Sequence, residues 1–131
     1  MTIQGFLLVG MGAAMGAWLR WWLSLVLNPL FPTIPLGTLA SNLIAGLLIG
    51  VAVELLTRVA RLQPEMGWLM ITGFLGGLST FSTFSAEIVT LIMRKQLWWS
   101  VAAVSAHLFG SVLLTIAGIL IVRAVFSTEP L

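Results

Sequence analysis

Residues that could bind an ion gather between Gly76 and Ser85, where a pair of glycines precedes a run rich in hydroxyls and aromatic rings. The run contains hydroxyl residues and phenylalanines in alternation, namely Ser79, Thr80, Phe81, Ser82, Thr83, Phe84 and Ser85. A hydroxyl donates a hydrogen bond to an anion, and the edge of an aromatic ring is electropositive because of its quadrupole. A narrow path lined by these groups favours a small anion, whereas a cation channel typically presents a ring of Asp or Glu.

The same run lies inside a long apolar segment, from about Trp68 to Met93. As a continuous helix this segment would be roughly 39 Å long, which exceeds the hydrocarbon core of about 30 Å. The surplus length permits a non-helical interruption near the midplane, and Gly76-Gly77 is the expected place for it. Unwound carbonyls there would suit a cation, and the start of the second half-helix would suit an anion. Because irregular backbone persists at that depth only inside protein or along a polar cavity, the pattern predicts an ion-handling site.

The composition indicates an integral membrane protein. Of the 131 residues, 60% are hydrophobic and 8% are charged, whereas soluble domains carry about 25% charged residues. The chain has no cysteine, which excludes disulfides, thiol chemistry and cysteine-based metal sites. A net charge of +2 without a basic stripe excludes a nucleic-acid footprint.

Four apolar segments predict an all-α membrane protein with four transmembrane helices in a single domain, residues 1–131. The expected spans are about 3–27, 37–56, 67–93 and 98–126, with the third helix broken near the midplane. The first two spans contain small-xxx-small pairs, which let another helix approach closely. These pairs are Gly12 with Gly16 and Gly46 with Gly50.

Polar side chains within the spans have two interpretations each. Asn42 either forms an interhelical hydrogen bond or donates into a permeation path. Arg20, among the tryptophans that end the first span, is either an interfacial anchor or a cation at a pore mouth that attracts anions. Glu87 is either a functional intramembrane carboxylate or the partner of a cation such as Arg94.

The fourth span carries a polar stripe on one helical face, formed by Ser100, His107, Ser111 and Thr115 together with Val104. This stripe also fits small-residue packing with hydroxyl bonds to the backbone. A single histidine without cysteine or a carboxylate at ligand spacing does not make a metal site.

The charged residues in the linkers give no firm orientation in the membrane. One end of the spans carries three cations and the other two or three: Arg58, Arg61 and Arg123 against Arg94, Lys95 and, if it reaches that side, Arg20. A chain with such balance can insert in both directions. Because four short helices enclose a pore poorly, we expect an antiparallel homodimer with the ion path at or near its interface.

The central run from Gly76 to Ser85 resembles the signature of the Fluc (CrcB-type) fluoride channels. The likeness extends over nearly the whole chain and includes Gly12 and Gly16 with Arg20-Trp21, Gly37 to Asn42, and His107 with Ser111. The residues alone would not choose fluoride over another small anion, so the identity of the ion comes from this resemblance.

The resemblance implies a dual-topology homodimer in the bacterial plasma (inner) membrane that passes toxic fluoride out of the cytoplasm by passive electrodiffusion through two pores. It implies a structural sodium ion at the dimer interface, held by backbone carbonyls that match Gly76 and Ser79. The implied pore residues that bind fluoride are Asn42, Phe81, Phe84, Ser82, Thr83 and Ser111. Arg20 matches a vestibule arginine, and Glu87 matches a glutamate that could act in coupling or gating.

Other classes compete with a channel. A proton-coupled exporter of the small four-helix type needs a buried carboxylate in its first helix, and this first span has none. A fluoride/proton antiporter would share the substrate and could use Glu87 for coupling. A membrane scaffold would explain the glycine pairs but not the hydroxyl-rich run. An enzyme would need a nucleophile–base pair or a metal cluster, and the only histidine has no evident partner in the sequence.

Overall fold

The computed structural model describes residues 2–58 and 64–127, and Arg61 of the second linker lies outside the described residues. The first two spans are α1 (Ile3–Leu27), followed by a short 3-10 turn (Asn28–Leu30), and α2 (Leu36–Arg58). The third span consists of α3 (Pro64–Gly67), a π-helical stretch (Trp68–Leu75), α4 (Gly76–Leu78) and α5 (Phe81–Met93). The last span is α6 (Leu97–Phe126).

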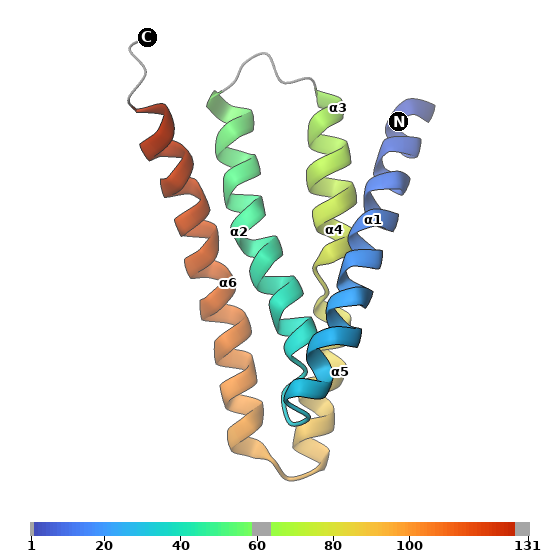
Figure 1. Cartoon of the computed structure of the whole chain (residues 1–131), viewed down its shortest axis with the longest axis vertical. Helices are drawn as coiled ribbons and strands as arrows, with labels where there is room; N and C mark the ends of the chain where they lie inside the picture. The colour runs from blue at the N-terminus through green and yellow to red at the C-terminus, as the bar shows by residue number, and fades with distance from the viewer. Residues whose placement is uncertain (1, 59–63, 128–131) are drawn as a thin grey trace.

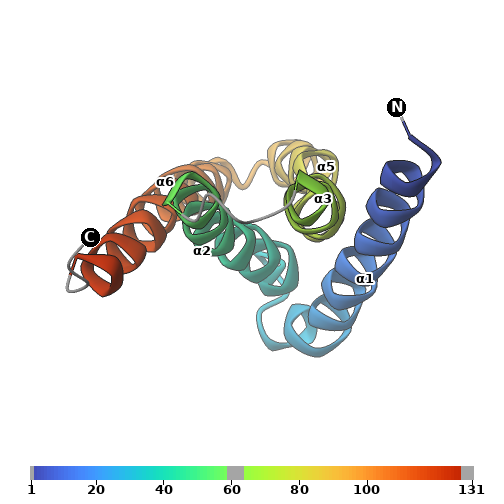
Figure 2. The same cartoon turned by 90° about the horizontal axis from the view of Figure 1, so that it is seen from above.

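Within the described residues, four helical stretches are long and apolar enough to cross a membrane: Ile3–Leu30, Leu36–Arg58, Pro64–Met93 and Leu97–Phe126. They run side by side, and the start of α1 lies at the same end of the molecule as the end of α6 (Figure 1). Seen from above, α2 lies against α6 and α1 lies against the third span (Figure 2). The sequence therefore folds as an all-helical protein with four membrane-capable helices.

Close backbone contact joins α1 to the third span. A Cβ at Gly12 or at Gly16 would collide with backbone atoms of Phe74 and its neighbours. In return, a Cβ at Gly77 would collide with the backbone of Ala13. The two elements thus approach closely because glycine leaves room on both sides, as small-xxx-small pairs do in membrane helices.

A second contact of the same kind joins α2 to α6. A Cβ at Gly50 would collide with the carbonyl oxygen of Thr115, and a Cβ at Gly118 would collide with that of Leu47. The hydroxyl of Thr115 donates to the carbonyl of Gly46 across this interface, at 2.9 Å. Dispersion contact and this hydrogen bond hold two helices together where lipid offers no hydrophobic driving force.

Two residues with extended backbone, Ser79 (φ −74°, ψ 154°) and Thr80 (φ −151°, ψ 118°), separate α4 from α5. The expected position, Gly76-Gly77, is wrong, because both of these glycines are helical. The structure uses Gly77 for its small size, which permits close contact with α1, and not for its conformational freedom. The chain leaves the helix two residues later, where side chains compete for the backbone hydrogen bonds.

Candidate ion-binding site

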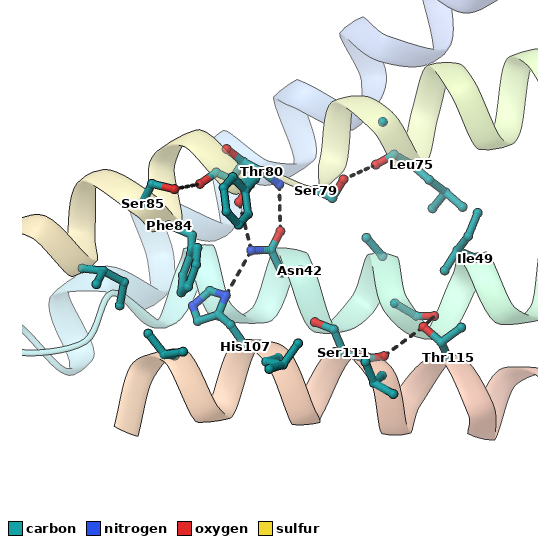
Figure 3. A pocket seen from close by; sticks show the side chains of 18 of the residues that line it. Asn42, Ile49, Leu75, Ser79, Thr80, Phe84, Ser85, His107, Ser111 and Thr115 are labelled. Carbon is teal, nitrogen blue, oxygen red and sulfur yellow. Dashed lines mark hydrogen bonds between the residues drawn. The ribbon is translucent and has the colours of Figure 1, made fainter. Parts of the chain in front are cut away.

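Asn42 of α2 pairs with the backbone of Thr80 as a neighbouring strand would. Its Oδ1 accepts from the Thr80 N–H at 2.7 Å, and its Nδ2 donates to the Thr80 carbonyl at 3.1 Å. The remaining hydrogen of Nδ2 points to Nδ1 of His107 on α6, at 3.1 Å (Figure 3). One side chain thereby connects α2, the extended pair and α6, and compensates the backbone groups that leave the helical pattern.

The carbonyls of Gly76 and Ser79 lose their helical donors at the extended pair. In an uninterrupted helix the Thr80 N–H would donate to the carbonyl of Gly76, but here it donates to Asn42. Likewise the Thr83 N–H would donate to the carbonyl of Ser79, but it donates to Oγ1 of Thr80 at 3.2 Å. Gly76 and Ser79 are both exposed and both line the same pocket. Their carbonyl oxygens therefore suit a hard cation that prefers oxygen ligands.

Thr80 begins α5 as its N-cap, and its hydroxyl organises the first turn. It accepts from the Thr83 N–H and donates to the Thr83 hydroxyl at 3.1 Å. The hydroxyl of Ser82 lies 3.3 Å from the same oxygen. Ser82 and Thr83 thus belong to a capping network at the start of α5, where unpaired N–H groups and the helix dipole favour an anion.

The two phenylalanines lie one turn apart on α5. Their ring centroids are 5.6 Å apart, and Phe81 is 78% exposed on the single chain. Phe84 lies against the ring of His107, with centroids 4.6 Å apart (Figure 3). His107 is buried, at 6% exposed, and so holds Phe84 on one side and Asn42 on the other.

A pocket of about 950 Å³ lies between the third span, α2 and α6. Its wall includes these predicted site residues: Asn42, Gly76, Ser79, Phe81, Phe84 and Ser111. Other predicted site residues lie away from that wall in the described part of the chain: Arg20, Ser82, Thr83 and Glu87. The pocket also contains His107, which sequence reasoning did not choose as a site residue although it stands on the polar face of the fourth span.

Arg20 contacts the third span from α1. Its Nε donates to the carbonyl of Gly77 at 3.2 Å. At the carboxyl end of a helix the last carbonyls lack helical donors, and a cation there stabilises them. Arg20 therefore supports the backbone just before the extended pair, a contact that neither of the two sequence interpretations contained.

Glu87 of α5 accepts a hydrogen bond from the hydroxyl of Thr38 on α2. Thr38 is buried, at 1% exposed. Ion pairs in the described part of the chain involve a different acid, Glu54, which binds Arg58 and Arg123. The alternative in which Glu87 pairs with Arg94 is therefore not what the structure contains.

The comparison with known proteins covers most of the chain. The family described as CrcB-like protein, Camphor Resistance (CrcB), matches residues 7–119. A protein of Nitrosospira multiformis is 54% identical over 123 residues, which are 94% of this chain and 96% of the relative. One of Ralstonia pickettii is 54% identical over 123 residues, 94% of this chain and 98% of the relative.

A more distant relative from Pseudomonas putida is 49% identical over 117 residues, 89% of this chain and 92% of the relative. All three carry the name Fluoride-specific ion channel FluC. The matched range, residues 7–119, includes parts of all four membrane-capable stretches and the positions of the extended pair and the pocket wall. The chain belongs to the CrcB-like family.

Proposed function

We propose that this chain forms a fluoride-selective ion channel of the bacterial inner membrane, which passes fluoride passively out of the cytoplasm. The observation that carries the proposal is the extended pair Ser79-Thr80, held by Asn42 at the edge of a pocket lined by Phe81 and Phe84. The choice of fluoride rests on the names of the bacterial relatives. A channel makes and breaks no covalent bonds, so its function needs no catalytic group.

The chemistry of the pocket suits a small, strongly hydrated anion. Removing fluoride from water requires donors that replace its hydration shell, since an ion in low dielectric is otherwise costly. Hydroxyl and N–H donors and the electropositive edges of Phe81 and Phe84 supply such contacts. Asp and Glu are absent from the wall among the described residues, which suits an anion and not a cation.

We further propose that the working unit is an antiparallel, dual-topology homodimer with two pores. The pocket of about 950 Å³ is open in a single chain, and Phe81 is 78% exposed beside it. A second copy would cover this face and enclose the extended pair, as irregular backbone at membrane depth requires.

A structural sodium ion at the dimer interface is part of the proposal. The carbonyls of Gly76 and Ser79 would hold it, because their helical donors bind elsewhere. Such an ion would supply a fixed positive charge between the two copies. The hydrogen bond from the Thr80 N–H to Asn42 orients the peptide unit that also carries the Ser79 carbonyl.

The second candidate function is a proton-coupled exporter, including a fluoride/proton antiporter. It is favoured by one observation, the partly buried carboxylate of Glu87 bonded to Thr38. Glu87 lies outside the pocket wall, which favours a passive channel.

Efflux from liposomes tests the proposal. Purified protein is reconstituted into vesicles loaded with potassium fluoride, and valinomycin starts the experiment by carrying potassium. We expect fluoride efflux at a fluoride electrode and no chloride efflux from matched chloride vesicles. Loss of both ions at similar rates would contradict selectivity, and fluoride efflux coupled to proton uptake into the vesicles would indicate antiport.

A further inference from the structure

Two arginines meet one glutamate where α2 and α6 end. Nε of Arg58 donates to Oε1 of Glu54 at 2.7 Å. From α6, Arg123 donates to the same carboxylate twice, through Nε to Oε1 at 3.0 Å and through a terminal nitrogen to Oε2 at 3.4 Å. None of these three residues lines the pocket. The cluster Arg58–Glu54–Arg123 therefore belongs to another part of the surface than the ion-binding site.

The glycine contact between α2 and α6 brings these side chains together. Gly50 lies one turn before Glu54 and packs against the backbone of Thr115. Both helices run in the same direction and end at the same end of the molecule (Figure 1). Their close approach therefore places the last turn of α2 beside the last turn of α6.

The helix dipole explains the two arginines but not the glutamate. Arg58 and Arg123 lie in the last turns of their helices, where a cation is favoured by the carbonyls at the helix end. A carboxylate near the same end is disfavoured by the same field. Glu54 is instead stabilised by the two guanidinium groups, and in return it holds both of them in fixed positions.

The cluster keeps an excess of positive charge and unused donors. In the described part of the chain no second carboxylate pairs with either arginine. The side chain of Glu54 is 12% exposed, whereas those of Arg58 and Arg123 are 37% and 56% exposed, so the guanidinium groups face outward. Their N–H groups that do not reach Glu54 bind no described residue. A planar fork of N–H donors matches the oxygens of a phosphate group.

The position of the cluster along the helices corresponds to the headgroup level of a bilayer. Leu36–Arg58 and Leu97–Phe126 are both membrane-capable, and arginines at the ends of such spans reach the interface. On the side toward the middle of the spans, Val53 and Leu120 are exposed apolar side chains. A ligand at the cluster would therefore have charge above it and hydrocarbon below it.

We propose that Arg58 and Arg123, held together by Glu54, bind the phosphate group of an anionic phospholipid. Basic sites between transmembrane helices suit such headgroups. Free phosphate offers the same oxygens, but the exposed apolar side chains below the cluster favour a ligand that carries acyl chains. The site does not depend on which ion the protein passes.

Thermal unfolding of the purified protein in a neutral detergent tests the ligand, because a molecule that binds the folded state raises the thermal midpoint. Short-chain phosphatidylglycerol, phosphatidylcholine with the same acyl chains, and inorganic phosphate are titrated separately. We expect phosphatidylglycerol to act at about fivefold lower concentration than phosphatidylcholine, because one excess cation near the surface attracts it. Inorganic phosphate should have no effect at these concentrations.

Equal action of the two lipids overturns the proposal. A rise in midpoint with inorganic phosphate and none with phosphatidylglycerol overturns the lipid as the ligand. Each variant below is compared with its own lipid-free midpoint, so a change in basal stability does not obscure the result.

Arg123→Lys and Arg94→Lys form a matched pair of variants that keep the charge and lose the guanidinium fork. Arg94 is exposed at the opposite end of the helices and has no ion pair with a described residue. We expect Arg123→Lys to need severalfold more phosphatidylglycerol for the same rise in midpoint, and Arg94→Lys to match the wild type. Equal losses in both variants, or no loss in Arg123→Lys, overturn the proposal.

Glu54→Gln distinguishes a positioned site from general attraction. The substitution removes a negative charge, so attraction alone would make phosphatidylglycerol bind more tightly. We expect binding to weaken severalfold instead, because the charge-assisted bonds that hold the two arginines are lost. Tighter binding than in the wild type overturns the role of Glu54 and the site with it.

Discussion

Each polar atom of the Asn42 side chain has a partner, and two of those partners are backbone groups of Thr80. The sequence could predict that an amide in an apolar helix seeks hydrogen bonds. It could not predict that the partners would be a backbone N–H and C=O, since these groups become available only where the helix is interrupted. These contacts are interhelical hydrogen bonds, and donation by Asn42 into a permeation path stays a prediction.

Asn42→Asp tests this role at the residue scale. The carboxylate can still accept from the Thr80 N–H, but it cannot donate to the Thr80 carbonyl or to His107. Leaving such groups unpaired costs about 1–3 kcal/mol each, and fluoride efflux should fall about tenfold or more. Efflux from liposomes measures this, with size-exclusion chromatography to verify that the dimer remains. Efflux at the wild-type rate in Asn42→Asp would show that fluoride permeation does not depend on Asn42.

Phe81→Ile tests the aromatic part of the site. Because Phe81 is 78% exposed on the single chain, the substitution should disturb its fold little while removing the electropositive ring edge. We expect severalfold slower fluoride efflux. Phe109 is the control, since it is also exposed (62%) and lies off the pocket wall among the described residues. Phe109→Ile should conduct normally, and equal effects of both substitutions would argue for a general packing cause.

At the scale of elements, glycine determines where helices meet more than where they break. From the sequence, we expect the helix to be interrupted at Gly76-Gly77, because glycine is flexible. In the structure Gly77 is helical and serves contact with Ala13, while extended backbone occurs at Ser79 and Thr80. The hydroxyl of Thr80 and the amide of Asn42 replace helical hydrogen bonds there. Such tertiary competition for hydrogen bonds is not visible in the local sequence.

Gly16→Ala and Gly10→Ala test the contact between α1 and the third span. A methyl group at Gly16 would collide with backbone atoms, whereas no atom lies within 4 Å of a methyl group at Gly10. Overpacking typically costs about 1–3 kcal/mol, so Gly16→Ala should lower the thermal midpoint in detergent and Gly10→Ala should not. Similar midpoints for Gly16→Ala and the wild type would contradict the close contact.

At the scale of the whole molecule, hydropathy predicts four membrane-capable helices and the structure contains them. The central run also predicts much of the pocket, including Phe81, Phe84 and Ser79. The sequence did not predict His107 as a site residue, because nothing in the spacing relates it to Asn42, which lies 65 residues away. That contact requires α2 and α6 to be adjacent, which spacing along the sequence does not specify.

Dual topology can be tested without background because the chain has no cysteine. Gln96→Cys and Thr57→Cys place a thiol at opposite ends of the helices, at exposed positions. In spheroplasts, an impermeant maleimide should label about half of each variant before permeabilisation and the rest afterwards. Full labelling of one variant together with none of the other would mean a single orientation and contradict the antiparallel dimer.

The reversal potential in a planar bilayer tests the central claim of passive, fluoride-selective conduction most directly. Fluoride is placed at unequal concentrations on the two sides, with chloride as the balancing anion. We predict current that reverses at the fluoride equilibrium potential and does not move when a pH gradient is added. A reversal that follows chloride would contradict selectivity, and one that follows the pH gradient would contradict a channel and establish proton coupling.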